Sequence, residues 1–467
     1  MLAKNVNDNV GCLVIRGAYS FFASNRASTG CSYSRFRLVL RSPALTSALI
    51  KSILASPLAD RERSLMNRPI HAQEKSSFIL LLMAMTLLAV FPLDVVLPSF
   101  PALSEHFRTS PTDIALSVSL FAIGLAFSLL LIGPLSDMFG RKKLLLGGIA
   151  LAAVGATGCL FASDFTWFLV FRVVQAVGCG SFALSQALVQ DLFAGRELER
   201  LRIWMTTAGG IFISSSPLMG TWLQLHLGWQ GSFYVFISLA IIVWLRSWFL
   251  LRESRSSERA PRRFFGAYWL LLSDIRFTGY WLISALAFAC HFSFLIISPI
   301  IFMEHLDLSA YQFAWALLLY GAAYVIGGVV ASILHRHLEG GTQIIIGLGL
   351  IALSGLVMLW LAWQFGLSAA TVLIPMLICT AGTTVSRPIA NSRAMSLYPQ
   401  HAGTSTSAGS LMIFMCGGLI SAVINLASEH LTTALGLCFL ILSAVGLGLN
   451  ALIRRRALSS SKITTTV

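Results

Sequence analysis

The sequence predicts an all-α membrane protein in which twelve helices cross the bilayer as two groups of six. Hydrophobic residues make up 56% of the 467 residues and charged residues only 11%, whereas soluble domains carry about 25% charged residues. Apolar stretches of about 20 residues, long enough to cross a hydrocarbon core of ~30 Å, recur along the chain. One long basic segment separates the first six stretches from the last six.

Each apolar stretch is expected to be a helix, because a helix pairs its own backbone N–H and C=O groups where no water can reach them. The expected spans are 77–100, 112–133, 143–163, 166–190, 203–226, 230–251, 278–302, 311–334, 342–365, 369–392, 405–428 and 431–453. The N-terminal six-helix half is then 77–251 and the C-terminal half 278–453. Residues 252–277 form a basic linker, and 454–467 form a tail.

The basic residues predict the orientation of these spans. Lys and Arg cluster after even-numbered spans, for example at 141–143, 252–276 and 454–456, whereas Arg108 is the sole cation of the alternate loops. Cytosolic loops carry such an excess, so both termini are expected on the cytosolic side of a bacterial cytoplasmic membrane. Because the net charge of +14 is spread over many loops, no nucleic-acid partner is expected.

Residues 1–76 differ in composition, because they are polar, rich in Ser and Arg, and poor in acidic residues. Three interpretations stay open: an organelle transit peptide, a cytosolic tail, or translated upstream sequence with the true start at Met66. We assign no function to the residues before Met66.

A short charged loop between spans 2 and 3 reads Gly-Pro-Leu-Ser-Asp-Met-Phe-Gly-Arg-Lys-Lys over residues 133–143. Glycine permits close backbone approach, and an acid beside several cations can cap a helix or form an ion pair. This chemistry suits a conformational latch, whose candidate residues are Gly133, Asp137, Gly140, Arg141 and Lys142. The equivalent loop of the second half, 335–341, keeps only a trace of the pattern, so asymmetric gating is expected.

The latch loop resembles the loop between helices 2 and 3 of the major facilitator superfamily of transporters. Residues 398–409 also resemble the P-x-x-A-G-T-A-S stretch of its drug:proton antiporter branch, the bicyclomycin and chloramphenicol resistance group. The resemblance covers roughly residues 77–453. It implies the major facilitator fold, a latch whose acid helps to lock the outward-open state, and a transporter rather than an enzyme.

Asp94 is the foremost candidate for proton coupling, because an ionisable group inside the hydrocarbon costs ~2.5–3.5 kcal/mol or more unless it is paired or hydrated. Its surroundings resemble the Asp-x-x-Leu-Pro signature of the branch, with Val96 where a tyrosine is usual. An apolar wall favours the neutral carboxyl, which can then exchange a proton in each cycle. The alternative is that Asp94 caps a helix break near the periplasmic end.

Arg172 begins a segment, Arg-Val-Val-Gln-Ala-Val-Gly, that resembles the R-x-x-Q-G-x-G motif with Ala176 in place of its first glycine. Its depth matches that of Asp94, so one hypothesis is that Arg172 lowers the proton affinity of Asp94 when the two approach. The alternative is a structural anchor that hydrogen-bonds backbone carbonyls. Gln175 of the same motif is a candidate for the cavity wall.

Two further ionisable residues lie inside spans of the second half. His291 is expected near mid-membrane, where it either titrates and contacts substrate or packs structurally. Arg387 precedes a proline, an arrangement unusual for the branch, and either faces the cavity and favours anionic substrates or extends to the cytosolic face as an orientation charge. Asn391, four residues further, is another candidate for the cavity wall.

Span 5 resembles the G-x-x-x-G-P-x-x-G-G antiporter motif, although Ser216 and Thr221 replace two of its glycines. Gly210, Pro217 and Gly220 remain, which predicts a kinked helix in close contact with a neighbour. Such small-residue runs also occur for packing reasons alone.

No cofactor or metal is expected, because the sequence has no Cys/His ligand spacing and no phosphate-binding loop for ATP. We therefore expect a monomeric, proton-coupled antiporter that exports small organic molecules by alternating access. Dedicated export of a siderophore, metallophore or other polar metabolite is an alternative, and a non-transporting sensor or scaffold is a more distant one.

Overall fold

The computed structural model describes residues 72–193, 195–251, 264–398, 401–427 and 430–464. The chain divides into two compact units, residues 1–75 and 76–467. Of the first unit only residues 72–75, which begin a helix, are described, so the proposals for the preceding residues and for Met66 lie outside the described part of the chain. All that follows concerns the second unit.

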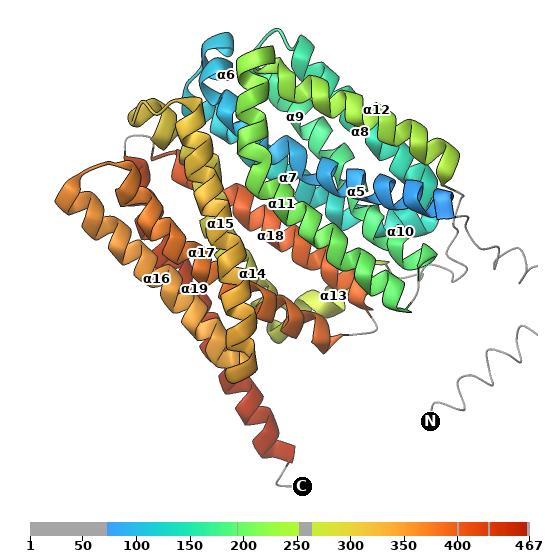
Figure 1. Cartoon of the computed structure of the whole chain (residues 1–467). Coiled ribbons are helices and arrows are strands. Elements are labelled where there is room, and N and C mark those ends of the chain that lie inside the picture. The colour runs from blue at the N-terminus through green and yellow to red at the C-terminus, as the bar shows by residue number, and fades with distance from the viewer. Residues whose placement is uncertain (1–71, 194, 252–263, 399–400, 428–429, 465–467) are drawn as a thin grey trace, which may run out of the picture. The chain divides into compact units, whose positions relative to one another are not determined.

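The described residues form helices and connecting turns, and no strand occurs among them (Figure 1). The elements are α5 (Ala72–Asp94), η1 (Leu97–Ser99), α6 (Phe100–Phe107), α7 (Pro111–Phe139), α8 (Arg141–Phe161), α9 (Phe165–Cys179), η2 (Gly180–Ala183), α10 (Leu184–Leu192), α11 (Gly195–Leu227), α12 (Gln230–Leu250), α13 (Phe264–Ser273), α14 (Ile275–Pro299), η3 (Ile300–His305), α15 (Ala310–His337), α16 (Gly340–Phe365), α17 (Ala369–Leu397), α18 (Ala402–Asn425) and α19 (Leu431–Thr464).

Eleven helical segments of the described chain are long and apolar enough to cross a membrane, and they coincide with eleven predicted spans. The remaining predicted span, 203–226, lies in the 33-residue helix α11. That helix is long enough to cross, but a run of Gly, Ser and Thr makes it less apolar. The prediction of an all-α membrane protein with twelve spanning helices is confirmed.

The same local structure begins the second span of each half, which indicates an internal repeat. Arg108 and Asp307 both take a left-handed conformation with φ of 51°. Two residues later, Ser110 and Ser309 each form a capping box at the start of α7 and α15. A capping box satisfies backbone N–H groups that the first turn of a helix leaves without partners.

Two helix pairs join the halves: α7 packs against α18, and α11 packs against α15. Small residues and polar side chains mediate this packing, as is usual between helices in a bilayer. Ser119 and Ser421 hydrogen-bond across the first pair at 2.8 Å, and Asn425 donates to the carbonyl of Thr112. In the second pair, Gly321 faces the side chain of Ser214.

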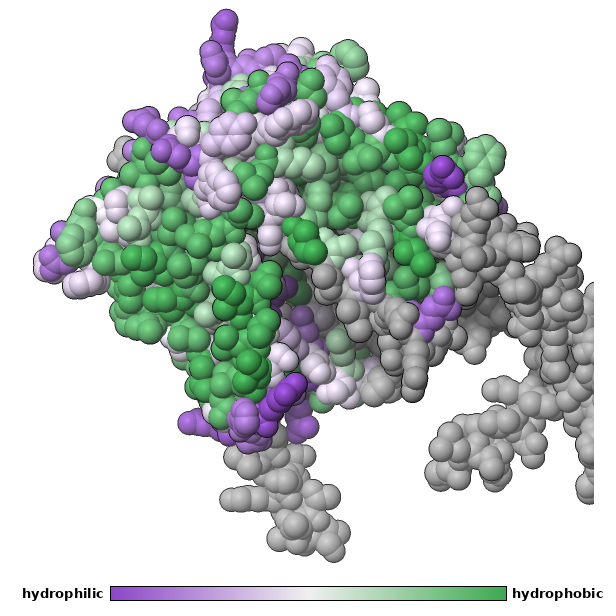
Figure 2. All heavy atoms as spheres, viewed as in Figure 1, coloured by the Kyte–Doolittle hydropathy of each residue, from purple (hydrophilic) through white to green (hydrophobic). Residues whose placement is uncertain are grey.

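A hollow opens between α15 and α11 on the face shown in Figure 2, with hydrophilic surface at its base and apolar surface on α15. This apolar surface is suited to lipid. A hydrophilic hollow between the two halves is the arrangement expected of a transport pathway.

Gly155 of α8 offers a test of this packing, because a Cβ at this position would overlap the backbone nitrogen of Gln175 in α9. We expect Gly155→Ala to lower the free energy of unfolding by about 1–3 kcal/mol, the usual cost of overpacking. Gly147→Ala is the matched control on the same helix, since no atom lies within 4 Å of its Cβ position. Thermal denaturation in detergent measures both, and equal stability of the two variants would contradict the close α8–α9 contact.

Candidate functional site

The helix of the first span is interrupted at Asp94, the foremost candidate for proton coupling. Helix α5 ends at Asp94, two residues follow, and the chain continues through η1 and α6. Pro98 explains the break, because proline has no N–H to donate and disfavours a helical conformation in the residue before it. The Asp94 side chain is only 4% exposed, and its Oδ2 atom is buried without a hydrogen-bond partner.

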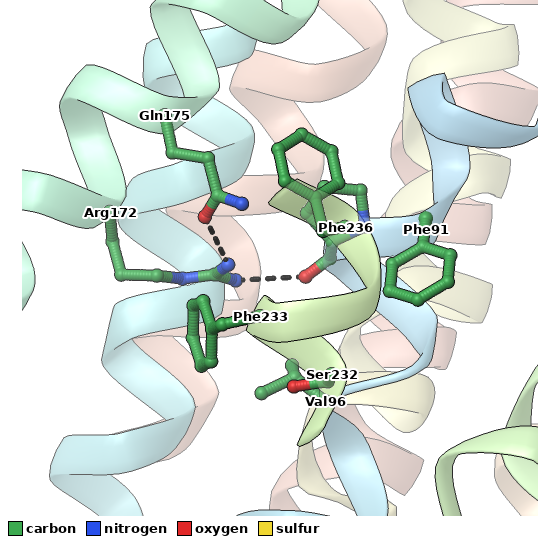
Figure 3. A pocket seen from close by; sticks show the side chains of 8 residues that line it. Phe91, Val96, Arg172, Gln175, Ser232, Phe233 and Phe236 are labelled. Atoms are coloured by element: carbon green, nitrogen blue, oxygen red, sulfur yellow. Dashed lines mark hydrogen bonds between the residues drawn. The ribbon is translucent and has the colours of Figure 1, made fainter. Parts of the chain in front are cut away.

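Arg172 of α9 lies beside this break and is 1% exposed. Its Nη2 atom donates to the carbonyl oxygen of Pro92 at 3.0 Å, and its Nη1 atom donates to Oε1 of Gln175 at 2.9 Å (Figure 3). The guanidinium also lies 4.5 Å from the ring centre of Phe121 and 6.0 Å from that of Phe233. Cation–π contacts of this kind stabilise a desolvated cation.

The hydrogen bond to Pro92 stabilises the end of α5, because the last four carbonyls of a helix have no partner within it. Arg172 satisfies one of these carbonyls in the broken span. The structural anchor considered above is therefore the arrangement seen here, and both bonded nitrogens contact groups other than Asp94. The Nε atom of Arg172 is buried without a partner, so this side chain retains donor capacity close to the break.

A small recess lies against the anchor. Figure 3 shows Arg172 and Gln175 on one side of it and Phe236 and Phe91 on the other. The wall is apolar apart from three polar side chains, those of Arg172, Gln175 and Ser232, and its other members are Phe91, Pro92, Val96, Phe233 and Phe236. Gln175 lines this recess, and its role in the wall of a substrate cavity stays a prediction.

Helix α11 supports the break from the other side. A Cβ at Gly220 would overlap the carbonyl oxygen of Val95 and would lie 3.1 Å from Pro98, so α11 rests directly on the segment that follows Asp94. Pro217 lies inside the same helix, as does Gly210. The next residue, Thr221, donates to the carbonyl of Ala310 in α15 at 3.2 Å, which connects the break to the second half.

The predicted latch loop over 133–143 is helical except at Gly140, because α7 continues to Phe139 and α8 begins at Arg141. This latch segment ties the start of α8 to the rest of the first half. Gly140 has φ of 94° and ψ of 142° between α7 and α8, a conformation that favours glycine. Arg141 donates to the carbonyl of Ala187 at 2.9 Å, and Lys142 donates to that of Trp248 at 2.7 Å. Gly133 lies in α7 opposite Ser407 of α18. Asp137 is in α7, but its side chain lies outside the described part.

The loop that corresponds to the latch in the second half has different contacts. Arg393 lies against Gly340 and Gly341 and donates to the hydroxyl of Tyr280 at 3.3 Å. The two loops therefore differ in their stabilising contacts. Outside this loop, Tyr398 donates to Oδ2 of Asp274 at 2.9 Å, and this hydrogen bond raises the pKa of the Tyr398 hydroxyl.

His291, Arg387 and Asn391 lie in the second half, on α14 and α17. The ring of His291 stacks on Tyr320, with centroids 5.2 Å apart, and the Tyr320 hydroxyl hydrogen-bonds Nδ1 of His291. The guanidinium of Arg387 lies 4.8 Å from the ring centre of Phe288. The candidates thus form two groups, one around Asp94 in the first half and one around Arg387 in the second.

Sequence reasoning missed Tyr320 and the serine pair between the halves. Tyr320 and Ser421 are buried polar residues inside apolar spans, which is a signal that the sequence does contain. It does not reveal which partner each residue meets, because the partners lie on distant helices. No group of three or more His, Cys, Asp or Glu residues that could hold a metal occurs in the described part of the chain.

Replacement of Arg172 by Lys tests the anchor, because an ammonium keeps the charge but loses the rigid fork. We expect Arg172→Lys to lower stability by about 1–3 kcal/mol, since it leaves the Pro92 carbonyl or the Gln175 amide without a partner. Arg455→Lys, at an exposed position of α19, is the control, and both variants are compared by thermal denaturation. An unchanged melting temperature for Arg172→Lys would show that the guanidinium geometry is not needed to stabilise the end of α5.

Comparison with known proteins supports the same scaffold. Residues 82–422 match the model of the Major Facilitator Superfamily. The chain is 26% identical to a bicyclomycin resistance protein homolog of Haemophilus influenzae, over 79% of this chain and 93% of the relative. It is 27% identical to a chloramphenicol resistance protein of Pseudomonas aeruginosa, over 80% and 90%, respectively.

A solved structure shows the same fold at low sequence identity. The D-xylose–proton symporter superposes with a TM-score of 0.62 at 15% identity, over 79% of this chain and 96% of that one. The family match covers most of the chain, including the helices that carry Asp94, Arg172 and Arg387. The chain therefore belongs to the major facilitator superfamily, and it is a multi-pass membrane transporter rather than an enzyme.

Proposed function

We propose that this protein is a proton-coupled antiporter that exports small organic molecules across the bacterial cytoplasmic membrane. The observation that carries the proposal is Asp94, an acid that is buried in a spanning segment with one oxygen lacking any partner. Acids inside the bilayer are rare and mark proton relays or substrate pathways. Relatives named for bicyclomycin and chloramphenicol resistance support the export of drug-like molecules.

Proton exchange at Asp94 would be linked to movement through the groups around the break. A protonated carboxyl is neutral and tolerates the apolar surroundings, whereas a carboxylate requires a cation or water. Arg172 is placed to respond, because it already binds the carbonyl two residues before Asp94. Transfer of one of its donors to the carboxylate would weaken the hold on Pro92, and the break would move against Gly220 of α11.

Alternating access would follow as the two halves rock against each other. The contact of Thr221 with Ala310 would carry a shift of the break to α15, and the small-residue contacts between α7 and α18 suit a sliding interface. In this scheme Asp137 and the latch loop stabilise one of the two states. We further propose cytosolic termini, in accord with the basic loops, and a monomeric transporter.

One observation favours the alternative of a dedicated exporter for a polar metabolite. Arg387 contacts Phe288, and a cation in this position is unexpected in a site built for neutral drugs alone. Membership of a transporter family argues against the non-transporting sensor or scaffold.

We expect the change Asp94→Asn to abolish export, because an amide cannot bind and release the coupling proton. The measurement is accumulation of chloramphenicol, bicyclomycin and ethidium in an efflux-deficient bacterial host, with and without a proton ionophore. Wild-type protein should lower the accumulation of at least one compound until the ionophore is added, whereas Asp94→Asn should match cells that lack the protein.

Glu304→Gln is the matched control, because Glu304 is an exposed acid next to the end of α14. It should retain wild-type export. Ionophore-sensitive export by the Asp94→Asn variant would place the coupling proton elsewhere. If the wild-type protein lowers the accumulation of none of the three compounds, the dedicated exporter becomes the better account.

A further inference from the structure

Arg387 is a cation inside the second half that has no acidic partner among the described residues. Its Nε atom is buried without a hydrogen-bond partner, and its guanidinium stacks on Phe288. The described acids of this half and of the linker before it lie at or near helix ends, and they are Asp274, Glu304, Asp307 and Glu339. None of them hydrogen-bonds or ion-pairs with Arg387 in the described structure.

An orientation charge at the cytosolic face does not explain this placement. Arg387 lies 10 residues before the end of α17 at Leu397, which is about 15 Å along the helix. Its ring partner Phe288 lies 13 residues after the start of α14 at Ile275, about 20 Å in. The guanidinium therefore contacts a neighbouring helix instead of extending along α17 toward its end.

Polar and aromatic groups converge around the cation. Asn391 is four residues beyond Arg387 and so lies on the same face of α17, and its Oδ1 atom is also buried without a partner. The ring of His291 lies 6.2 Å from that of Phe288 and 5.5 Å from that of Tyr324, measured between centroids. We call Arg387, Asn391, His291, Phe288 and Tyr320 the Arg387 cluster.

Part of the Arg387 cluster is accessible at the surface. Arg387, Asn391 and His291 are each half-buried, whereas Tyr320 is buried. Tyr320 lies on α15, the helix that borders the hydrophilic hollow of Figure 2. Arg387 is partly exposed, so a ligand can reach it, and its Nε atom has no partner and can donate to that ligand.

We propose that the Arg387 cluster binds an organic anion, specifically a carboxylate on a flat, aromatic or conjugated body. The guanidinium fork matches a carboxylate with two parallel hydrogen bonds, and the ligand would supply the negative charge that the protein does not. The rings of Phe288 and Tyr320 provide apolar surface for the flat body, and the Asn391 carbonyl oxygen can accept from a ligand N–H or O–H. This inference rests on the proposed function, because it names a substrate class for the exporter.

The test is calorimetric binding to the purified full-length protein in detergent with three probes of one shape: 1-naphthoate, 1-naphthamide and 1-naphthylmethylamine. We expect naphthoate to bind more tightly than the neutral amide, and the cationic amine to bind weakest. Arg387→Gln should lower naphthoate affinity by about 10- to 100-fold, the loss expected for one charge-assisted contact. Arg455→Gln removes an exposed cation of α19 and should leave naphthoate affinity unchanged.

Equal affinity of the wild-type protein for the three probes would overturn the proposal, as would undiminished naphthoate binding in Arg387→Gln. The affinities of the three probes are ranked on the wild-type protein. This ranking tests the proposal even if the Arg387→Gln variant does not fold. Binding is also independent of export. If the wild-type protein prefers naphthoate in the binding assay but exports no drug in cells, the antiporter is refuted and the anion site stands. If it exports a drug but does not prefer naphthoate, the anion site is refuted and the antiporter stands.

Discussion

The structure depends on how a broken helix is stabilised inside a membrane. Helix α5 ends at Asp94 inside its span, and a helix end leaves carbonyl groups that need partners in a place from which water is excluded. The hydrogen bond from Arg172 to the Pro92 carbonyl meets part of this requirement, and Gln175 with two aromatic rings holds the guanidinium in place. A buried cation and a helix break thus stabilise each other.

This arrangement explains why several motifs that are distant in sequence meet at one place. Gly220 of α11 packs on the segment after Asp94 because only glycine fits against the Val95 carbonyl, and Thr221 continues the contact to Ala310 in the second half. The second half carries the cation Arg387, which has no acidic partner among the described residues. The proposed roles divide accordingly, with proton exchange assigned to the first half and anion recognition to the second.

The sequence was sufficient for the spans and for the identity of the buried charges, because both follow from local composition. It placed Asp94, Arg172 and Arg387 inside the membrane from the hydropathy of their neighbours alone. It did not decide between ion pair and carbonyl anchor for Arg172, nor between cavity and cytosolic face for Arg387. The contacts that favour one interpretation over the other are with Pro92 and Phe288, which lie 80 and 99 residues away in the chain, and packing at such separations leaves no local signal.

The central claim is that Asp94 exchanges a proton when substrate binds, and proton release from purified protein tests it most directly. Chloramphenicol or naphthoate is added to the detergent-solubilised protein in weakly buffered solution, and the pH change is recorded for the wild type and for Asp94→Asn. The account predicts release of protons by the wild type and none by the variant. Equal release by both proteins would contradict it, because the titrating group would then lie elsewhere in the chain.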